Sequence, residues 1–189
     1  MTTEVRAPSP ADDIAEILID TPAIAAKVAE LGARITADYA GKDPVFVSIL
    51  KGALPFLADL MRNVPIPLSL DFLEVSSYGD STETSGVVRI LKDLAHPVEG
   101  RHVLVVEDIL DTGFTLRYVL GHLHDQRPTS VRLCTLLDKP ARRIVPIVVD
   151  YRGFEIPDRF VVGYGLDYGE RYRNLPFIGV LKPEVYGRS

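Results

Sequence analysis

The alternation of apolar and polar positions divides the chain into segments of two kinds. Short apolar runs typical of strands occupy residues 45–50, 68–75, 87–91, 102–106, 131–137 and 144–150. Apolar residues at helical spacing occupy residues 12–19, 21–41, 53–62 and the stretch after residue 113. Because helices and strands alternate with short connections, the pattern predicts an α/β fold of right-handed βαβ units around a mostly parallel central sheet flanked by helices.

The two ends of the chain are expected to complete this fold. Residues 1–13 are predicted to be loose, and the tail and parts of the N-terminus are predicted to form a small hood over the strand ends. The helix over 21–41 has clear boundary signals: Thr21 offers a capping hydroxyl, Pro22 suits the first helical position, and Gly41 suits the stop.

Composition and charge narrow the class of protein. A chain of 189 residues, 47% hydrophobic and 25% charged, is expected to form a single globular domain over residues 1–189. The net charge of −5 argues against a general nucleic-acid binder. No apolar run approaches the roughly 20 residues of a membrane span, and no secretory signal is visible. The single Cys134 is expected to be a buried strand thiol, so we expect a cytoplasmic protein.

A stretch in the middle of the chain combines a buried strand with candidate chemistry. The apolar run 102–106 leads into two carboxylates, Glu107 and Asp108, and then into the small turn 111–113 before a helical pattern. Such a turn can direct backbone N–H groups at a phosphate. Paired carboxylates suit a ribose diol or a magnesium ion. The combination indicates a ribose phosphate, although the acidic residues could instead simply cap the next helix.

Two lysines and one polar loop are further candidates for contact with a ligand. Lys51 and Lys139 each follow a buried strand, where a charge should face either solvent or a ligand. Residues 76–86 are small and polar, which fits a solvated hairpin loop or a mobile lid. Four arginines, Arg142, Arg143, Arg171 and Arg173, could bind a small polyanion.

The stretch Val105–Thr115, with the sequence VVEDILDTGFT, resembles the phosphoribosyl-pyrophosphate (PRPP) signature of the type I phosphoribosyltransferases. In detail it is similar to the 6-oxopurine branch, the hypoxanthine-guanine phosphoribosyltransferases. Leu50-Lys51-Gly52 matches the pyrophosphate loop of that family, whose Leu–Lys peptide is often cis, although Ala53 replaces a second glycine. The similarity runs from Val45 to Arg173, with five separate motifs in the expected order.

The resemblance implies the type I phosphoribosyltransferase fold and a reaction of purine salvage. A nitrogen of hypoxanthine or guanine would attack C1′ of PRPP, giving IMP or GMP and pyrophosphate. The resemblance also implies Mg²⁺ as the cofactor, PRPP and 6-oxopurine bases as the small-molecule partners, and a homodimer or homotetramer. No nucleic acid or membrane partner is expected.

Residue roles follow from the same match for the PRPP stretch. Glu107 and Asp108 would bind the ribose hydroxyls and Mg²⁺, and Asp111 would be the general base or electrostatic partner at purine N7. The ribose 5′-phosphate would lie against a cradle formed by Ile109, Leu110, Asp111, Thr112, Gly113, Phe114 and Thr115. Phe114 stands where some relatives have lysine.

The remaining roles concern pyrophosphate and the base. Pyrophosphate would contact Lys51, Gly52, Ser77, Tyr78 and Arg173. The base would contact Lys139 at O6, Phe160 by stacking, Val161 by its backbone, and the region of Asp167, which would also serve the second metal. Without the family context, Phe160 would be interpreted as a core residue. Tyr168 and Glu170 are expected to be structural, and the four histidines, at 96, 102, 122 and 124, are not expected to bind metal.

Two alternatives belong beside this interpretation. The chain could be a phosphoribosyltransferase-like module that binds RNA as a regulator, although the acidic pI of about 5.4 weighs against it. It could also act on another base. Lys139 argues against adenine, because an ammonium has only donors to offer an exocyclic amine, but xanthine differs from guanine only at the 2-position.

Overall fold

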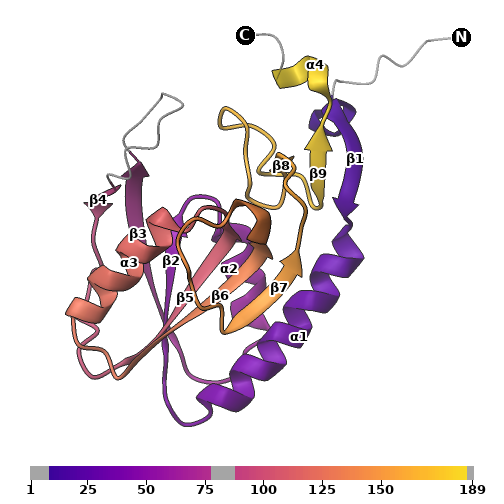
Figure 1. Cartoon of the computed structure of the whole chain (residues 1–189). Coiled ribbons are helices and arrows are strands. Elements are labelled where there is room, and N and C mark those ends of the chain that lie inside the picture. The colour runs from indigo at the N-terminus through magenta and orange to yellow at the C-terminus, as the bar shows by residue number, and fades with distance from the viewer. Residues whose placement is uncertain (1–8, 78–87, 187–189) are drawn as a thin grey trace, which may run out of the picture.

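The structure is a computed structural model that describes residues 9–77 and 88–186. It contains a six-stranded sheet in the order β4-β3-β2-β5-β6-β7 and a three-stranded sheet in the order β1-β9-β8 (Figure 1). The strands of the larger sheet are β2 (Val45–Leu50), β3 (Ser69–Ser77), β4 (Val88–Lys92), β5 (His102–Leu110), β6 (Ser130–Asp138) and β7 (Tyr151–Glu155). Those of the smaller sheet are β1 (Ile14–Ile19), β8 (Val161–Val162) and β9 (Ile178–Leu181).

The larger sheet is parallel except at one edge. β2 pairs in parallel with β3 and β5, and β6 continues the parallel order on to β7, whereas β4 is antiparallel to β3. Its central strands are buried on both faces, as their continuous apolar runs predict. The prediction of a mostly parallel α/β sheet is therefore confirmed.

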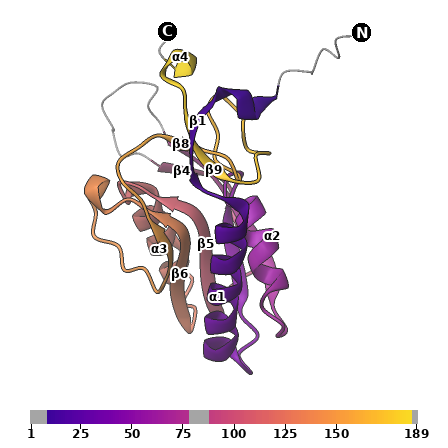
Figure 2. The same cartoon turned by 90° about the vertical axis from the view of Figure 1, so that its right-hand side faces the viewer.

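Helices cover both faces of this sheet. The helices on its faces are α1 (Thr21–Tyr39), α2 (Leu54–Arg62) and α3 (Phe114–Asp125). The 3₁₀-helix η2 (Pro140–Arg142) follows β6, whereas the 3₁₀-helix η1 (Pro10–Asp13) precedes β1 and helix α4 (Pro183–Tyr186) follows β9, beside the smaller sheet (Figure 1). Figure 2 shows α1 and α2 on one side of the sheet and α3 on the other. The packing of the side chains shows the same arrangement. One apolar cluster joins α1 and α2 to Phe46 and Leu104, and another joins α3 to Val47 and Val103.

Helix α1 confirms the predicted helix but not its predicted cap. The Asp20 carboxylate accepts a hydrogen bond from the Ala23 N–H at 2.9 Å, so Asp20 is the cap. The Thr21 hydroxyl instead donates to the Pro176 carbonyl at 2.8 Å and ties α1 to the loop before β9. The helix ends at Tyr39, shortly before Gly41 as predicted.

The smaller sheet is the predicted hood, but it corrects one element. Residues 12–19 were expected to be helical, and Ile14–Ile19 are strand β1, paired antiparallel with β9. The strand conformation prevails because β9 supplies a partner from the far end of the chain, and such pairing outweighs a short local pattern. In the described ranges no helix has the length and apolar character that a membrane crossing needs.

The segment 144–150 is a second correction. It was predicted to be a strand, but it is an irregular connection before β7. The N–H groups of Ile144 and Val145 both donate to the Thr112 carbonyl at 3.0 Å, and Pro146 has no N–H to offer a neighbouring strand. Val145 and Ile147 therefore lie over Gly113 in the turn after β5 instead of joining the sheet, while Ile144 and Val148 are exposed.

Candidate active site

The candidate site lies where the carboxyl ends of the parallel strands meet the hood. Lys51 and Gly52 follow β2, Glu107 and Asp108 lie near the end of β5, and Lys139 follows β6. Since parallel strands end at the same edge, the three segments become neighbours although they are far apart in sequence.

Two glycines show how closely these segments pack. A Cβ atom on Gly52 would lie 1.9 Å from Asp108 Oδ2, and one on Gly165, whose φ is +102°, would lie 1.9 Å from the Gly52 carbonyl oxygen. The Leu50–Lys51 peptide is cis, as the resemblance suggested. The predicted pyrophosphate loop, the PRPP stretch and the hood therefore touch through backbone at Gly52, where no side chain fits.

The adjacent carboxylates of β5 are poorly supplied with donors from the protein. Glu107 Oε2 is buried without a hydrogen-bond partner, while Asp108 Oδ1 accepts from the Ile109 N–H at 2.7 Å. Burial, and then the neighbouring Asp108, raise the pKa of Glu107 well above its usual value. Burial also raises the pKa of Asp108 to about 6, against the lowering effect of the Ile109 N–H. These acceptors suit incoming hydroxyl donors or a hard cation.

The turn after β5 presents backbone to the solvent side of the site. Gly113 is the N-cap of α3 with φ +91°, and no side chain caps the helix start. The exposed N–H groups of a helix start attract an anion such as a phosphate. A cavity of about 140 Å³ opens here, lined by Glu107, Ile109, Leu110, Asp111, Thr112, Gly113, Thr115 and Leu116. The Phe114 side chain does not line this cavity. The Arg117 guanidinium lies over the Phe114 ring, with Cζ 5.9 Å from the ring centroid.

Asp111 belongs to a chain of charges that the sequence did not reveal. Its Oδ1 lies 3.1 Å from Arg142 Nε, and Arg142 in turn lies 3.7 Å from Asp158. Lys139 Nζ is 4.0 Å from the same Asp158 carboxylate, and Lys139 is only 5% exposed. The candidate general base and the candidate base-binding lysine are thus linked through Arg142 and Asp158, which come from η2 and the loop before β8.

Arg143 does not fit the polyanion role considered for it. Its guanidinium donates to the Asp111 carbonyl at 2.9 Å and the Leu110 carbonyl at 3.2 Å, and it pairs with the buried Asp138 carboxylate. It therefore holds the backbone of the turn after β5 in place.

The hood contributes an exposed aromatic ring. Phe160 is 49% exposed, so the core alternative is wrong, and its ring meets Tyr168 edge-on at 5.8 Å between centroids. Val161 starts β8 beside it and pairs with Val180. An accessible ring at this edge of the hood is available for stacking against a flat ligand.

Arg173 is a cation of the hood whose charge acts to lower the pKa of Asp108. It donates to the Gly165 carbonyl at 2.8 Å and lies 2.9 Å from Asp167 Oδ1. Glu170, which was expected to be structural, contacts both Arg173 and Lys51 at 3.0 Å. Nothing in the local sequence around Glu170 could reveal contacts that span two distant loops.

Unsatisfied polar atoms concentrate in this site. Among the described residues, the buried side-chain atoms without a hydrogen-bond partner are Tyr39 Oη, Glu107 Oε2, Arg173 Nε and Asp111 Oδ1, the last of which has only its ion pair with Arg142. All but the tyrosine hydroxyl belong to the candidate site, which is the pattern expected where a ligand completes the hydrogen bonding.

The remaining predictions concern a metal site, the loop 76–86 and Cys134. No group of three or more His, Cys, Asp or Glu side chains in residues 9–77 and 88–186 could hold a metal by itself. Tyr78 and most of the loop 76–86 lie outside the described residues, and Ser77 is described only as the last residue of β3. Cys134 is buried as predicted, and burial raises the pKa of its thiol.

The comparisons with known proteins agree with this geometry. The family model for the phosphoribosyl transferase domain matches residues 15–169. The hypoxanthine-guanine phosphoribosyltransferase of Bacillus subtilis is 53% identical over 92% of this chain and 97% of its own length. A crystal structure of a hypoxanthine phosphoribosyltransferase from Staphylococcus aureus has a TM-score of 0.90 and 50% identity, covering 93% of this chain and 95% of that one.

A further relative has a different length. The bifunctional protein TilS/HprT of Listeria innocua is 53% identical over 93% of this chain, but the match spans only 27% of that protein. The fold is that of the type I phosphoribosyltransferases. The chain belongs to the hypoxanthine-guanine phosphoribosyltransferase family.

Proposed function

We propose that this chain transfers the 5-phosphoribosyl group of PRPP to hypoxanthine or guanine. A purine nitrogen forms a bond to C1′ while the bond from C1′ to the pyrophosphate oxygen breaks, yielding IMP or GMP and pyrophosphate. The observation that carries this proposal is the close contact of Gly52 with Asp108 and of Gly165 with Gly52, because it joins a phosphate loop, a diol-binding edge and a cationic hood in one place.

The PRPP end of the site would position the sugar. The exposed start of α3, with the hydroxyls of Thr112 and Thr115, would hold the 5′-phosphate, and Glu107 and Asp108 would accept from the ribose hydroxyls. Lys51 and Arg173 would neutralise the departing pyrophosphate, where a guanidinium fork suits phosphate oxygens.

The base would enter from the hood side. The accessible Phe160 ring would stack on it, the Val161 backbone would contact its edge, and the Lys139 ammonium would donate to O6. Asp111 would accept the proton released from the purine ring, and its carboxylate lies 3.1 Å from Arg142 Nε.

Mg²⁺ is the cofactor that the donor set favours. Mg²⁺ binds through one or two carboxylates together with substrate phosphates and water. The orphaned Glu107 Oε2 beside Asp108 fits such a partial set, and Asp167 is a candidate for a second ion. Bound there, the ion would supply positive charge against the pyrophosphate.

A panel of bases tests the proposal. Pyrophosphate release is followed with PRPP, Mg²⁺ and each of hypoxanthine, guanine, xanthine, adenine and uracil. Turnover is expected with hypoxanthine and guanine, and adenine is expected to be inactive. No turnover with any base, combined with salt-dependent RNA binding, would instead support the regulatory module.

The setting of the enzyme is part of the same proposal. We infer a single functional unit over residues 1–189, a cytoplasmic location and a homodimer or homotetramer. The buried single thiol of Cys134 supports a reducing compartment, and light scattering would measure the oligomeric state.

A further inference from the structure

The Glu170 carboxylate lies between the two cations to which we assign pyrophosphate binding. Its Oε2 is 3.0 Å from Lys51 Nζ, and its Oε1 is 3.0 Å from an Arg173 guanidinium nitrogen. Each oxygen therefore has a different cation, and the carboxylate bridges the loop after β2 to the hood.

This bridge is accessible to solvent. The side chains of Lys51 and Glu170 are 63% and 64% exposed, so water and ions reach the contact. Exposed ion pairs of this kind are worth little and exchange readily. Arg173 also keeps Asp167 and the Gly165 carbonyl as partners, so it stays in place when Glu170 leaves.

We propose that Glu170 is an internal substitute for pyrophosphate: it holds Lys51 and Arg173 in the ligand-free enzyme and is displaced from both when pyrophosphate binds. This inference rests on the proposed function, which assigns the two cations to that group. Carboxylate and pyrophosphate oxygens only accept hydrogen bonds and both carry negative charge, so they compete for the same donors and repel each other.

Competition has a measurable consequence for affinity. Part of the binding energy of pyrophosphate is used to break the two contacts of Glu170, so removal of the bridge should tighten binding. The expected gain is about two- to fivefold in the dissociation constant, the scale of an exposed ion pair. The KM for PRPP should fall by a similar factor while the KM for the base stays the same.

Two variants separate a bridge from a simple effect of charge. Glu170→Gln removes the charge. Glu170→Asp keeps the charge but shortens the side chain by one methylene, so it cannot reach both cations. If the bridge is what competes, both variants bind pyrophosphate more tightly, whereas an effect of the field alone would appear only in Glu170→Gln.

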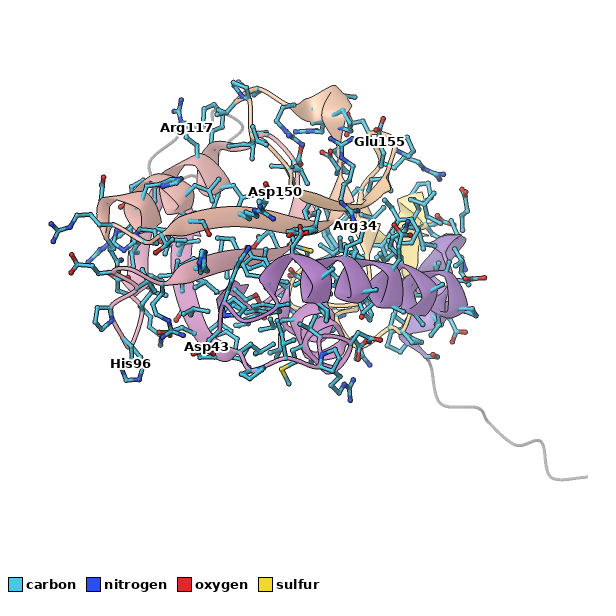
Figure 3. All side chains as sticks on the ribbon, turned by 90° about the horizontal axis from the view of Figure 1, so that it is seen from below. Arg34, Asp43, His96, Arg117, Asp150 and Glu155 are labelled. Carbon is cyan, nitrogen blue, oxygen red and sulfur yellow. The ribbon has the colours of Figure 1, made fainter. Side chains whose placement is uncertain are left out.

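The control is Asp43→Asn. Asp43 is 65% exposed, pairs with Arg101 at 3.5 Å, and lies before β2 at the opposite end of the sheet (Figure 3). The six residues of β2 separate it from Lys51, a rise of roughly 20 Å. This variant makes the same change of net charge as Glu170→Gln, and asparagine tolerates the positive φ of 45° at this position.

The experiment is calorimetric titration of the full chain with pyrophosphate and Mg²⁺, alongside IMP binding and the melting temperature of each variant. Tighter pyrophosphate binding in both Glu170 variants, with Asp43→Asn and IMP affinity unchanged, is the expected result. Unchanged or weaker binding in both Glu170 variants, or tightening in Glu170→Gln alone, would overturn the inference while leaving the proposed function intact. A wild-type chain that neither binds pyrophosphate nor turns over PRPP would overturn the proposed function and this inference with it.

Discussion

At the carboxyl end of β5, Glu107 Oε2 is buried with no hydrogen-bond partner, whereas near the amino end of β7 charged side chains pair with each other, although the nearby Tyr39 hydroxyl is also buried without a partner. There the Asp38 carboxylate accepts from the Tyr151 hydroxyl at 2.7 Å and from Arg132 at 2.9 Å. Figure 3 views the molecule from this lower side, where Arg34 donates to the Asp150 carbonyl at 3.4 Å. The charged groups of the Asp38 cluster are paired with each other, whereas the carboxyl end of the sheet holds buried carboxylate and guanidinium atoms without a hydrogen-bond partner.

This difference identifies the end that has been shaped for a ligand. A buried polar group without a partner costs roughly 1–3 kcal/mol, so a chain selected only for stability would not place several together. Under the proposed function, this cost at the carboxyl end would be offset when hydroxyls, phosphates and Mg²⁺ bind. Changes at this end should therefore act on catalysis, and changes at the opposite end should leave catalysis unchanged.

The largest effect is expected from Asp111→Asn. An amide cannot accept the purine proton, so kcat should fall about 10²- to 10⁴-fold. The melting temperature should change little, because the side chain is partly exposed and pairs with the half-exposed Arg142. Steady-state kinetics with hypoxanthine measure the loss, and Asp125→Asn, an exposed carboxylate at the far end of α3, is the control. Retention of wild-type turnover would remove Asp111 from the mechanism.

The second-largest effect is expected from Gly52→Ala. The new Cβ would lie 1.9 Å from Asp108 Oδ2, so the carboxylate and the loop after β2 must separate. A displacement of this kind should lower kcat/KM for PRPP by about 10²-fold.

Gly121→Ala is the matched control for that change. Gly121 lies in helix α3, and a Cβ atom added there would meet no atom within 4 Å apart from the helix's own backbone and its chain neighbours. It should leave activity unchanged and raise stability by up to about 1 kcal/mol, since alanine favours helix. Equal kinetic losses in the two variants would show that the close contact at Gly52 is irrelevant.

Glu107→Gln should separate stability from activity. Without ligands, replacement of the buried carboxylate should raise the free energy of unfolding by about 1–3 kcal/mol. With PRPP and Mg²⁺, turnover should fall because an acceptor for the diol and the ion is lost.

The pH dependence of this gain has a definite sign. Because the pKa of Glu107 is raised in the folded chain, the unfolded chain ionises first as pH rises above about 4.5, and the wild type loses stability there. The gain from Glu107→Gln should therefore be absent below that pH and grow above it. Urea unfolding at several pH values measures it, and a variant less stable than wild type at pH 8 would contradict the prediction.

The smallest effect is expected at the opposite end. The Tyr151 hydroxyl and Arg132 lower the pKa of Asp38, so Asp38→Asn should cost less than about 1 kcal/mol at neutral pH. Since the ionised carboxylate provides this stability, the difference from wild type should vanish as the pH falls below the pKa of the folded chain. Kinetic constants should not change, and a loss of turnover would break the contrast between the two ends.

Local patterns predicted much of this molecule. The boundaries of β2 match the predicted strand, helix α1 follows the predicted helix, and Lys51 and Lys139 lie at strand ends as expected. These features follow from burial on both faces of a strand or on one face of a helix, which consecutive residues record directly. The location of the site at the carboxyl ends of the strands could be predicted as well, because parallel strands end at the same edge of a sheet.

Other features were decided by contacts between distant segments. β1 is a strand because β9 lies beside it, and Asp111 has Arg142 as its partner because 144–150 folds back over the turn after β5. Glu170 reaches Lys51 from a loop in which Glu170 and Tyr172 adopt positive φ values of 64° and 75°, a conformation that their residue types do not favour. The amino-acid sequence by itself determined which residues are buried and where the chain turns. Which charges meet at the site depends on distant loops brought together by the sheet, and no local pattern records that.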